Sequence, residues 1–287
     1  MLSVQLLLAF LKFLSKFPYR VQIRMGSLVG RLVYHFANKR RAIAARNIEL
    51  CFPEATTAER KKLLRNHFSS LGRGLFETGL AYWAPDDRLR DLLKLDGLDR
   101  LQASLSRGRG VILITGHFTA MELGGRLLGL VADFDMVIRP LSHSEIDSVV
   151  RAGRQRAVGR VIPKESFREF LKGLRANRAI LITVDQATTA RSKVMAPFFG
   201  VPAPTSLVAA RIAKKYGAAV LPTLCLREAD LSGYRIEIGD PMSGFPTGDD
   251  MTDASRLNAM IEEQVLKAPE QYLWIHRRFK NEPSPYE

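Results

Sequence analysis

The segment that decides the fold is Val111–Arg126, which reads VILITGHFTAMELGGR. Its first five residues are leucine and the β-branched residues valine, isoleucine and threonine, a composition typical of a buried strand. Gly116 interrupts this run, and helical spacing follows to about Val131. The sequence therefore predicts a strand, a short loop and a helix, with His117 just beyond the carboxyl end of the strand. In open α/β sheets, ligands bind at this edge.

Glu122 lies five residues after His117, in the first turns of the predicted helix. We expect Glu122 to fix the tautomer of the imidazole and to stabilise the imidazolium. The other ring nitrogen then accepts a proton from a hydroxyl group. A histidine that packs in a purely structural role after a strand would show the same spacing. The interpretation therefore depends on the residues that surround this pair.

The charge of the chain points to a polyanionic partner. Its 287 residues are enough for one large domain, and 46% hydrophobic with 25% charged residues is typical of a folded protein. Lys and Arg number 43 against 29 Asp and Glu, a net charge of +14. The partner could be nucleic acid, an anionic membrane or an acidic protein. Cys51 and Cys225 lie far apart without metal-ligand spacing, which favours buried thiols in a reducing compartment.

Residues 1–18, MLSVQLLLAFLKFLSKFP, form an apolar segment with its few polar residues gathered on one side of a helical wheel. The run is too short for a confident transmembrane span, and Lys12 interrupts it. It also lacks the charged start and the small-residue cleavage site of a signal peptide. Because Lys16, Arg20 and Arg24 follow it, we expect a cytoplasmic anchor that is embedded in the membrane or lies at its interface. The alternative is an amphipathic helix that packs on the protein's own core.

After this anchor we expect a single α/β domain at residues 19–287, whose first part, about 19–84, is helical. Thr56 or Thr57 is expected to cap one of these helices. Beyond Pro85, strands and helices alternate. The predicted strands are 111–115, 134–138, 160–162, 180–184, 218–225 and 234–238, and the predicted helices are 98–106, 119–131, 144–157, 166–176, 205–216 and 254–267. This alternation indicates a mixed central sheet flanked by helices.

Three further polar residues are predicted at or near the same edge of the sheet. Arg139 follows the second predicted strand, Arg154 lies on the next helix, and Asp185 follows the strand at 180–184. If the strands are neighbours, these side chains converge with His117 and Glu122 on one crevice. Cations there would bind anionic headgroups, with Asp185 holding Arg154 or a neighbouring cation. Each arginine taken alone would be read as a surface charge or a structural ion pair.

Residues 196–205, APFFGVPAPT, are predicted to be a rigid, proline-bounded loop that leads into a helix. Thr205 or Ser206 is expected to cap that helix. The amino end of such a helix would offer backbone donors to a phosphate or an oxyanion.

Several of these motifs, in this order, resemble the bacterial lipid A biosynthesis acyltransferases, the late lauroyl and myristoyl transferases of the lysophospholipid acyltransferase-like superfamily. They are His117 with Glu122, the Arg139-Pro140 pair, Arg154 in GRQRAVGRVIP, Asp185 in VDQ, and APFFGVPAPT. The upstream segment NIELCFPEATTAERKKLLRNHF and the terminal segment PEQYLWIHRRFK match as well. The resemblance runs from the anchor to about Lys280.

The resemblance implies a glycerol-3-phosphate acyltransferase-like α/β fold and an activity. Such enzymes transfer a fatty acyl chain from acyl carrier protein to a hydroxyl of a lipid A precursor, at the cytoplasmic face of the inner membrane. The resemblance also implies that His117 is the general base and Glu122 its partner. It matches Arg154 and Asp185 to further positions that are important for activity. Arg139 is our own addition. The implied partners are acyl carrier protein, a lipid A precursor and an anionic membrane, and nucleic acid is not expected.

We expect direct transfer without an acyl-enzyme, because a thioester is already activated and the chain has no G-x-S-x-G motif. No cofactor is expected beyond acyl-acyl carrier protein or acyl-CoA as co-substrate. No metal is expected either, because no histidine pairs with another His or Cys at ligand spacing. One alternative is an acyltransferase for a glycerophospholipid or another glycolipid. Another is a basic membrane- or nucleic-acid-binding protein without catalysis, in which replacing His117 by alanine would change nothing.

Overall fold

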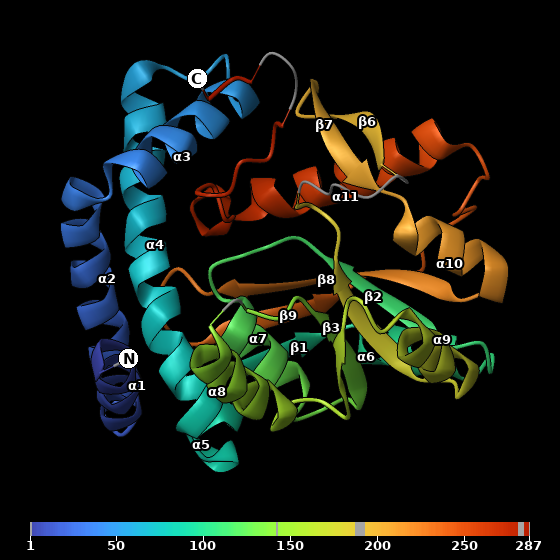
Figure 1. The fold of residues 1–287 in the computed structure, drawn as a ribbon, viewed down its shortest axis with the longest axis horizontal. Coiled ribbons are helices and arrows are strands. Elements are labelled where there is room, and N and C mark those ends of the chain that lie inside the picture. The colour runs from blue at the N-terminus through green and yellow to red at the C-terminus, as the bar shows by residue number, and fades with distance from the viewer. Residues whose placement is uncertain (1, 142, 187–192, 281–283, 287) are drawn as a thin grey trace.

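The computed structural model describes residues 2–141, 143–186, 193–280 and 284–286. A layered α/β unit occupies one part of the molecule, and a layer of long helices runs along its side (Figure 1). The helices of that layer are α1 (Leu2–Leu14), α2 (Tyr19–Phe36), α3 (Asn38–Cys51) and α4 (Thr57–Trp83). The remaining helices are α5 (Asp86–Arg90), α6 (Leu98–Leu105), α7 (Met121–Leu128), α8 (Ser144–Gln155), α9 (Phe167–Arg175), α10 (Val208–Tyr216), α11 (Asp250–Lys267) and the short 3₁₀ helix η1 (Pro269–Gln271).

The central sheet has seven strands in the order β1-β9-β8-β2-β5-β3-β4. They are β1 (Leu93–Asp96), β2 (Val111–Thr115), β3 (Phe134–Ile138), β4 (Val161–Pro163), β5 (Ala179–Thr183), β8 (Ala219–Arg227) and β9 (Tyr234–Ile238). The sheet is mixed, as predicted, because β9 runs antiparallel to β8 while β8, β2, β5, β3 and β4 are parallel. The β2–β5 register pairs Thr115 with Thr183. His117 and Asp185 therefore each follow their strand by the same two residues, on adjacent strands.

Strand β2 is buried on both faces, which explains its uninterrupted apolar sequence. Ile112 and Ile114 belong to the core under α9, α10 and α11. Val111 and Leu113 belong to the core on the other face, under α6 and α7. Because successive side chains of a strand point to opposite faces, one short strand joins the two halves of the core.

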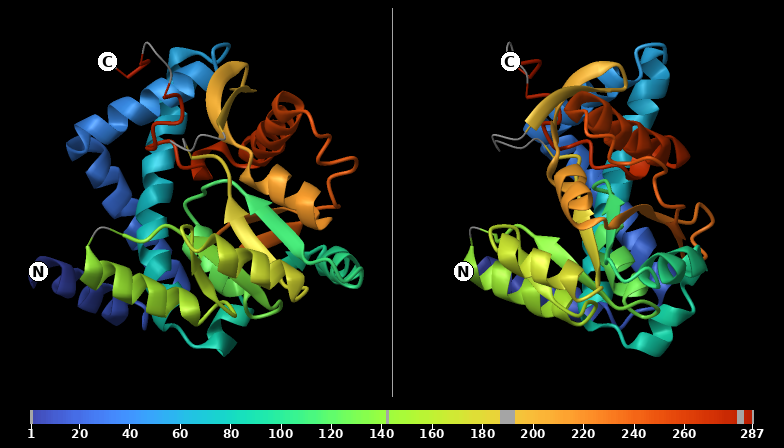
Figure 2. Two further views of the ribbon diagram at one scale, coloured as in Figure 1. Left: turned by 45° about the vertical axis from the view of Figure 1, so that its right-hand side comes forward. Right: turned by 90° about the vertical axis from the view of Figure 1, so that its right-hand side faces the viewer.

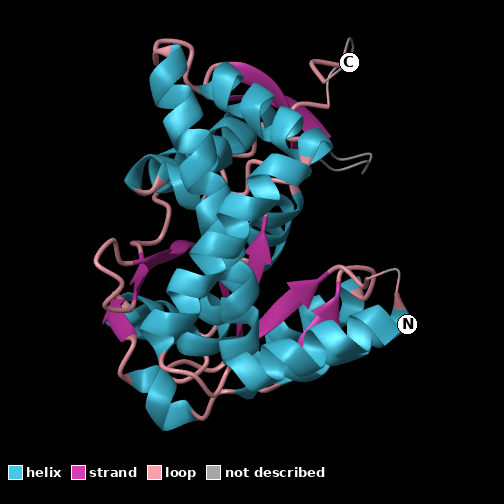
Figure 3. Ribbon diagram, turned by 90° about the vertical axis from the view of Figure 1, so that its left-hand side faces the viewer, coloured by secondary structure: helices cyan, strands magenta, loops and turns pink. Residues whose placement is uncertain are grey.

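Helix α4 is the longest helix and supports α2. Its amino end has a complete capping box, in which Thr56 accepts from the Glu59 backbone while Glu59 accepts from the Thr56 backbone, so the predicted cap is confirmed at Thr56. Helix α2 crosses α4 at a close glycine contact: a Cβ atom at Gly30 would lie 2.0 Å from the carbonyl oxygen of Phe68. Figure 3 shows this helical side of the molecule.

Helices α1 and α2 bury one side and expose large apolar side chains on the other. Helix α1 packs on α4 with Leu11 and Leu14 buried, and it leaves Phe10 and Phe13 exposed. Helix α2 buries mainly small or polar residues and exposes a row of apolar ones: Val21, Met25, Leu28, Leu32 and Phe36. No helix in the described part of the chain is both long enough and apolar enough to cross a membrane.

The loop predicted at 196–205 is instead a two-stranded antiparallel hairpin of β6 (Lys193–Phe198) and β7 (Val201–Ser206), seated on α11. The prolines indicated a loop, but a two-stranded hairpin tolerates proline because both of its strands are edge strands. The predicted cap at Thr205 or Ser206 is wrong as well. Strand β7 continues through Ser206, and α10 begins only at Val208, without a capping side chain. Strand β1 was also not predicted.

Candidate active site

His117 and Asp185 form a hydrogen-bonded pair at the carboxyl ends of β2 and β5. The Nδ1 atom of His117 lies 2.6 Å from Oδ1 of Asp185, and the backbone N–H of His117 donates to Oδ2 at 2.8 Å. Because an ionised carboxylate only accepts, the Nδ1 atom carries the proton, and Nε2 is the nitrogen that can accept one. The Asp185 side chain is 3% exposed and the His117 side chain 15% exposed. The carboxylate is thus buried, while the imidazole keeps partial access to solvent.

Asp185 remains charged in this position. Burial alone would raise the pKa of Asp185, but electrostatic interaction with His117 and the hydrogen bonds from its ring and backbone outweigh burial. The net result is a pKa well below the usual aspartate range. A buried carboxylate that accepts from Nδ1 is the arrangement that orients histidine bases in catalytic triads.

The carboxyl-terminal segment holds the loop that carries His117. The backbone N–H of Leu273 donates to the His117 carbonyl oxygen at 2.9 Å, and Thr119 donates to the Gln271 carbonyl oxygen at 2.7 Å. Phe118 and Tyr272 form an isolated antiparallel bridge between these bonds. The chain on both sides of the histidine is therefore fixed, which restricts the direction of the imidazole.

A buried ion pair between Glu77 on α4 and Arg227 on β8 is linked to the His117 loop through Ser70. The Nη2 atom of Arg227 donates to Glu77 at 2.8 Å, and its Nη1 atom donates to Ser70 at 3.0 Å. The Ser70 hydroxyl in turn bonds the Thr119 hydroxyl at 2.7 Å. Because both charges are buried and fully paired, this network joins α4, the sheet and the His117 loop in one fixed arrangement.

Glu122 has different partners from those predicted. It pairs with Arg154 of α8, whose Nε donates to Oε2 at 3.1 Å and whose Nη2 donates to Oε1. The Tyr82 hydroxyl at the end of α4 donates to the same Oε2 at 2.9 Å. The expectation that Glu122 orients His117 is therefore wrong. Asp185 was expected to hold Arg154 or a neighbouring cation, and its hydrogen-bonded partner is His117 rather than Arg154. The strand order explains this pairing. Strand β5 lies directly beside β2, which places Asp185 next to the imidazole of His117.

Arg139 directly follows β3 and is exposed. Within the described ranges, no hydrogen bond or ion pair joins it to another predicted site residue. The adjacency of β2, β5 and β3 nevertheless places the ends of all three strands along one edge of the sheet, as the sequence analysis required.

Three residues near the two pairs were not predicted as site residues. Tyr82 lies in the segment at about 19–84, for which the sequence predicted only a helical structure. Burial and then the charge of Asp185 raise the pKa of Tyr272 well above the usual tyrosine value. Burial lowers the pKa of His276 to about 4, and Asp185 and His117 lie close enough to affect it. The terminal segment PEQYLWIHRRFK contributed to the family resemblance, but its sequence did not indicate that it lies against His117.

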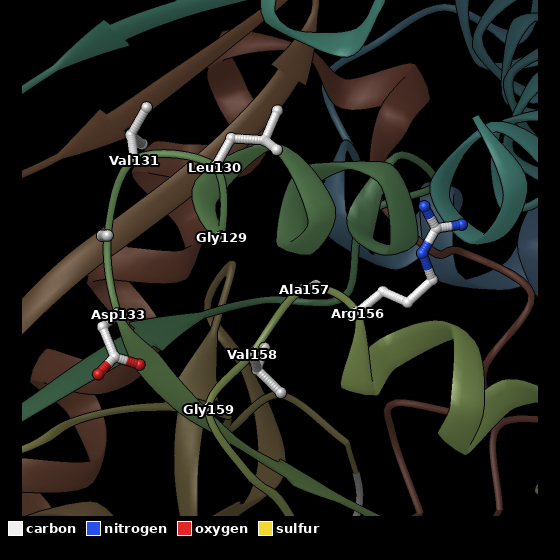
Figure 4. A pocket seen from close by; sticks show the side chains of 9 residues that line it. Gly129, Leu130, Val131, Asp133, Arg156, Ala157, Val158 and Gly159 are labelled. Carbon is white, nitrogen blue, oxygen red and sulfur yellow. The ribbon is translucent and has the colours of Figure 1, made fainter. Parts of the chain in front are cut away.

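Two cavities of similar size lie elsewhere in the described structure. One, of about 460 Å³, lies between the segments that follow α7 and α8, near the amino ends of β3 and β4 (Figure 4). The other, of about 470 Å³, is a mostly apolar crevice between α1, α8 and the end of α4, and Tyr82 lines it. Figure 2 shows α1 beside α8 at this place. His117 lines neither cavity, and the described residues contain no cluster of three or more His, Cys, Asp or Glu that could hold a metal ion.

Comparison with known proteins identifies the family. The profile of the bacterial lipid A biosynthesis acyltransferases matches residues 2–281 of the chain. The chain belongs to this family. It is thus an enzyme, an acyltransferase of lipid A biosynthesis, and its fold, a mixed central sheet flanked by helices, agrees with the expectation from the sequence.

Characterised members of the lipid A acyltransferase family align with nearly the whole chain. The lipid A biosynthesis palmitoleoyltransferase of Escherichia coli K12 is 38% identical over 267 residues, which cover 93% of this chain and 87% of the relative. The lauroyltransferase of the same organism is 34% identical with the same coverage. The myristoyltransferase is 25% identical over 271 residues, which cover 92% of this chain and 81% of the relative. These three relatives are named for three different acyl chains.

Proposed function

We propose that this acyltransferase moves a fatty acyl chain from an acyl carrier protein thioester to a hydroxyl of a lipid A precursor, with His117 as general base. The observation that carries the proposal is the His117–Asp185 pair at the carboxyl edge of the sheet, with Nδ1 occupied and the imidazole partly accessible. The positive charge of the chain supports both an acidic carrier protein and an anionic lipid as partners.

In the proposed reaction, Nε2 of His117 removes the proton from the acceptor hydroxyl as its oxygen attacks the thioester carbonyl. The negative charge of Asp185 stabilises the imidazolium that forms. The tetrahedral intermediate then expels the thiolate by cleavage of the C–S bond, and the imidazolium returns its proton to that sulfur. The products are the new ester and the free thiol of the carrier, and no acyl-enzyme forms.

Glu122 and Arg154 would act on the acceptor rather than on the imidazole. Arg154 is a half-buried guanidinium, and its pairing with Glu122 fixes the direction of its remaining N–H groups. A guanidinium in a fixed direction recognises a phosphate or an acidic sugar through two parallel hydrogen bonds. We propose that these N–H groups bind an acidic group of the lipid A precursor, and that Arg139 contributes charge at the same edge.

We further propose that α1 and α2 together bind the cytoplasmic face of the inner membrane. The apolar row on α2 occupies the side of the helix opposite α4, with exposed Arg20, Arg24 and Arg31 around it. An apolar row with basic residues beside it is the pattern of a helix that lies at an anionic bilayer surface. The proposed anchor thus extends beyond residues 1–18 into the first helix of the α/β domain at 19–287.

Vesicle flotation tests the membrane proposal. Leu28 and Leu32 are 59% and 54% exposed, so Leu28→Ser with Leu32→Ser should weaken binding to anionic phospholipid vesicles without unfolding the protein. Leu266→Ser on α11 is the matched control, because Leu266 is 60% exposed on another part of the molecule. Equal loss of binding in the control and the double variant would contradict the proposal.

The substrates are tested by supplying the purified protein with acyl donors and acceptors in all pairs. The donors are acyl carrier protein thioesters and acyl-CoA, and the acceptors are a lipid A precursor and a glycerophospholipid, with products followed by mass. We expect the largest kcat/KM for the carrier thioester with the lipid A precursor. Acylation of the glycerophospholipid alone would favour the alternative acceptor. Absence of any acylated product would contradict the proposed reaction.

A further inference from the structure

We propose that Tyr82 is a positioning residue for the proposed reaction and that it acts by holding the carboxylate of Glu122. This inference rests on the proposed function, in which Glu122 and Arg154 form the acceptor side of the site. The hydrogen bond from the Tyr82 hydroxyl to Oε2 of Glu122 is 2.9 Å long, and Nε of Arg154 donates to the same oxygen at 3.1 Å. Glu122 is thus fixed by two donors, one from α4 and one from α8.

The hydroxyl of Tyr82 is a permanent donor. The ring is buried, and burial together with the charge of Glu122 raises the pKa of Tyr82 well above the usual tyrosine value. The hydroxyl therefore keeps its proton around neutral pH and can donate a hydrogen bond to Glu122. A neutral donor aimed at a carboxylate forms a charge-assisted hydrogen bond, which is stronger than a bond between neutral groups.

Gly153 sets the position of the Tyr82 ring. A Cβ atom at Gly153 would lie 2.3 Å from Cδ1 and Cγ of Tyr82, so any larger residue would displace the ring. Gly153 directly precedes Arg154 on α8. The contact between ring and glycine therefore fixes the two donors to Glu122 relative to each other.

The crevice beside α1 adds a reason why the hydroxyl matters. Tyr82, Gly153 and residues of α1 line this crevice of about 470 Å³. Tyr82 is 4% exposed, so its ring is packed on its other sides and borders the crevice only in part. The bond to Glu122 therefore joins a ring at the edge of this crevice to the acceptor side of the proposed site.

The test is the substitution Tyr82→Phe, which keeps the ring and removes only the hydroxyl. We expect kcat to fall about tenfold, the lower end of the effect of one hydrogen bond to a charged group. The KM for the acyl donor should stay within about twofold, and the melting temperature should fall by only a few degrees. The control is Tyr216→Phe at the end of α10, whose hydroxyl makes only a 3.5 Å contact with Arg175. It should leave kcat unchanged.

A double-mutant cycle with Glu122→Ala separates positioning from general packing. If Tyr82 acts through Glu122, Tyr82→Phe should have no further effect on kcat once Glu122 is alanine. Gly153→Ala gives a second cycle, because it displaces the ring without removing the hydroxyl, and its effect should disappear in the same background.

The possible outcomes separate this inference from the proposed function. Full activity of Tyr82→Phe, or an equal fall in kcat with and without Glu122, would overturn the role of Tyr82. Even if the role of Tyr82 is overturned, the proposed function stands as long as the wild type transfers acyl chains and His117→Ala does not. A wild type without acyl transfer would instead contradict the proposed function.

Discussion

The substitution Asp185→Asn tests which carboxylate orients the imidazole. In the structure Asp185 accepts two hydrogen bonds from His117, at 2.6 Å from Nδ1 and 2.8 Å from the backbone N–H. The side chain of asparagine has the same shape, but its amide presents only one acceptor oxygen. One of the two donors must then lose its partner, or the imidazole must adopt the other tautomer with its proton on Nε2. The tautomer with its proton on Nε2 cannot accept the proton of the acceptor hydroxyl, and the loss of either bond leaves the imidazole less firmly oriented.

The expected magnitude follows from these two bonds. A hydrogen bond to a charged group contributes about 1.5–3 kcal/mol, and burial of Asp185 places this one at the upper end. The corresponding change in a serine-protease triad lowers kcat by about 10⁴. We therefore expect Asp185→Asn to lower kcat by about 10² to 10⁴, with a smaller effect on KM. Because the pKa of Asp185 is strongly depressed, the wild-type carboxylate is charged throughout about pH 5 to 9, so the comparison holds at each assay pH.

The assay is single-turnover acyl transfer followed by product mass, with Glu122→Gln measured in parallel and thermal unfolding recorded for both variants. We expect the rate of the chemical step to fall more in Asp185→Asn than in Glu122→Gln. The reverse order, with Asp185→Asn retaining more than about a third of wild-type kcat, would refute the reasoning and would restore Glu122 as the partner of His117.

Three further predictions concern stability. His67 is fully buried, its Nδ1 lies 3.2 Å from the carbonyl oxygen of Glu270, and burial lowers its pKa to about 4. The neutral histidine stabilises the fold above its unfolded pKa of about 6.5, and this stabilisation is lost as the pH falls toward 4. In the wild type, the free energy of unfolding in urea should therefore fall by about 2–3 kcal/mol more between pH 7 and pH 4.5 than in His67→Gln. An unchanged pH dependence in that variant would count against this assignment. Gly30→Ala should lower the free energy of unfolding by about 1–3 kcal/mol because its Cβ would overlap Phe68, and a melting temperature equal to that of the wild type would contradict the close crossing of α2 and α4. Glu77→Gln should destabilise the protein by about 3–5 kcal/mol in denaturant unfolding because it leaves a buried guanidinium without its charge partner, and a loss below about 1 kcal/mol would show that the network is not important for the fold.

The sequence predicted the elements that carry the site. The run at Val111–Thr115 forms the predicted strand, with His117 two residues beyond it. Asp185 follows β5 in the same way. Local composition decides such elements, because a strand buried on both faces requires apolar residues throughout.

The pairing within the site could not be predicted from the sequence. Which strands are neighbours depends on how the whole sheet is ordered, and no local pattern places β5 beside β2. Glu122 was the natural candidate for the partner of His117 because it is near in sequence, whereas Asp185 is separated from His117 by 68 residues. Tyr82 was missed for a similar reason: Glu122, to which its hydroxyl donates, is 40 residues away in the sequence.

Secondary structure that runs against residue preference was also missed. The prolines of APFFGVPAPT are unusual in strands, and only pairing of β6 with β7 in an isolated hairpin makes them compatible. The row on α2 was overlooked because basic residues interrupt it in sequence, although its apolar side chains lie on one side of the helix.

The rate of acyl transfer by His117→Ala, compared with the wild type under single-turnover conditions with an acyl carrier protein thioester and a lipid A precursor, tests the central claim most directly. If His117 is the general base, the rate constant for transfer should fall by at least about 10²-fold, while the melting temperature stays within a few degrees of the wild type. Transfer by a folded His117→Ala variant at a rate close to that of the wild type would contradict the account.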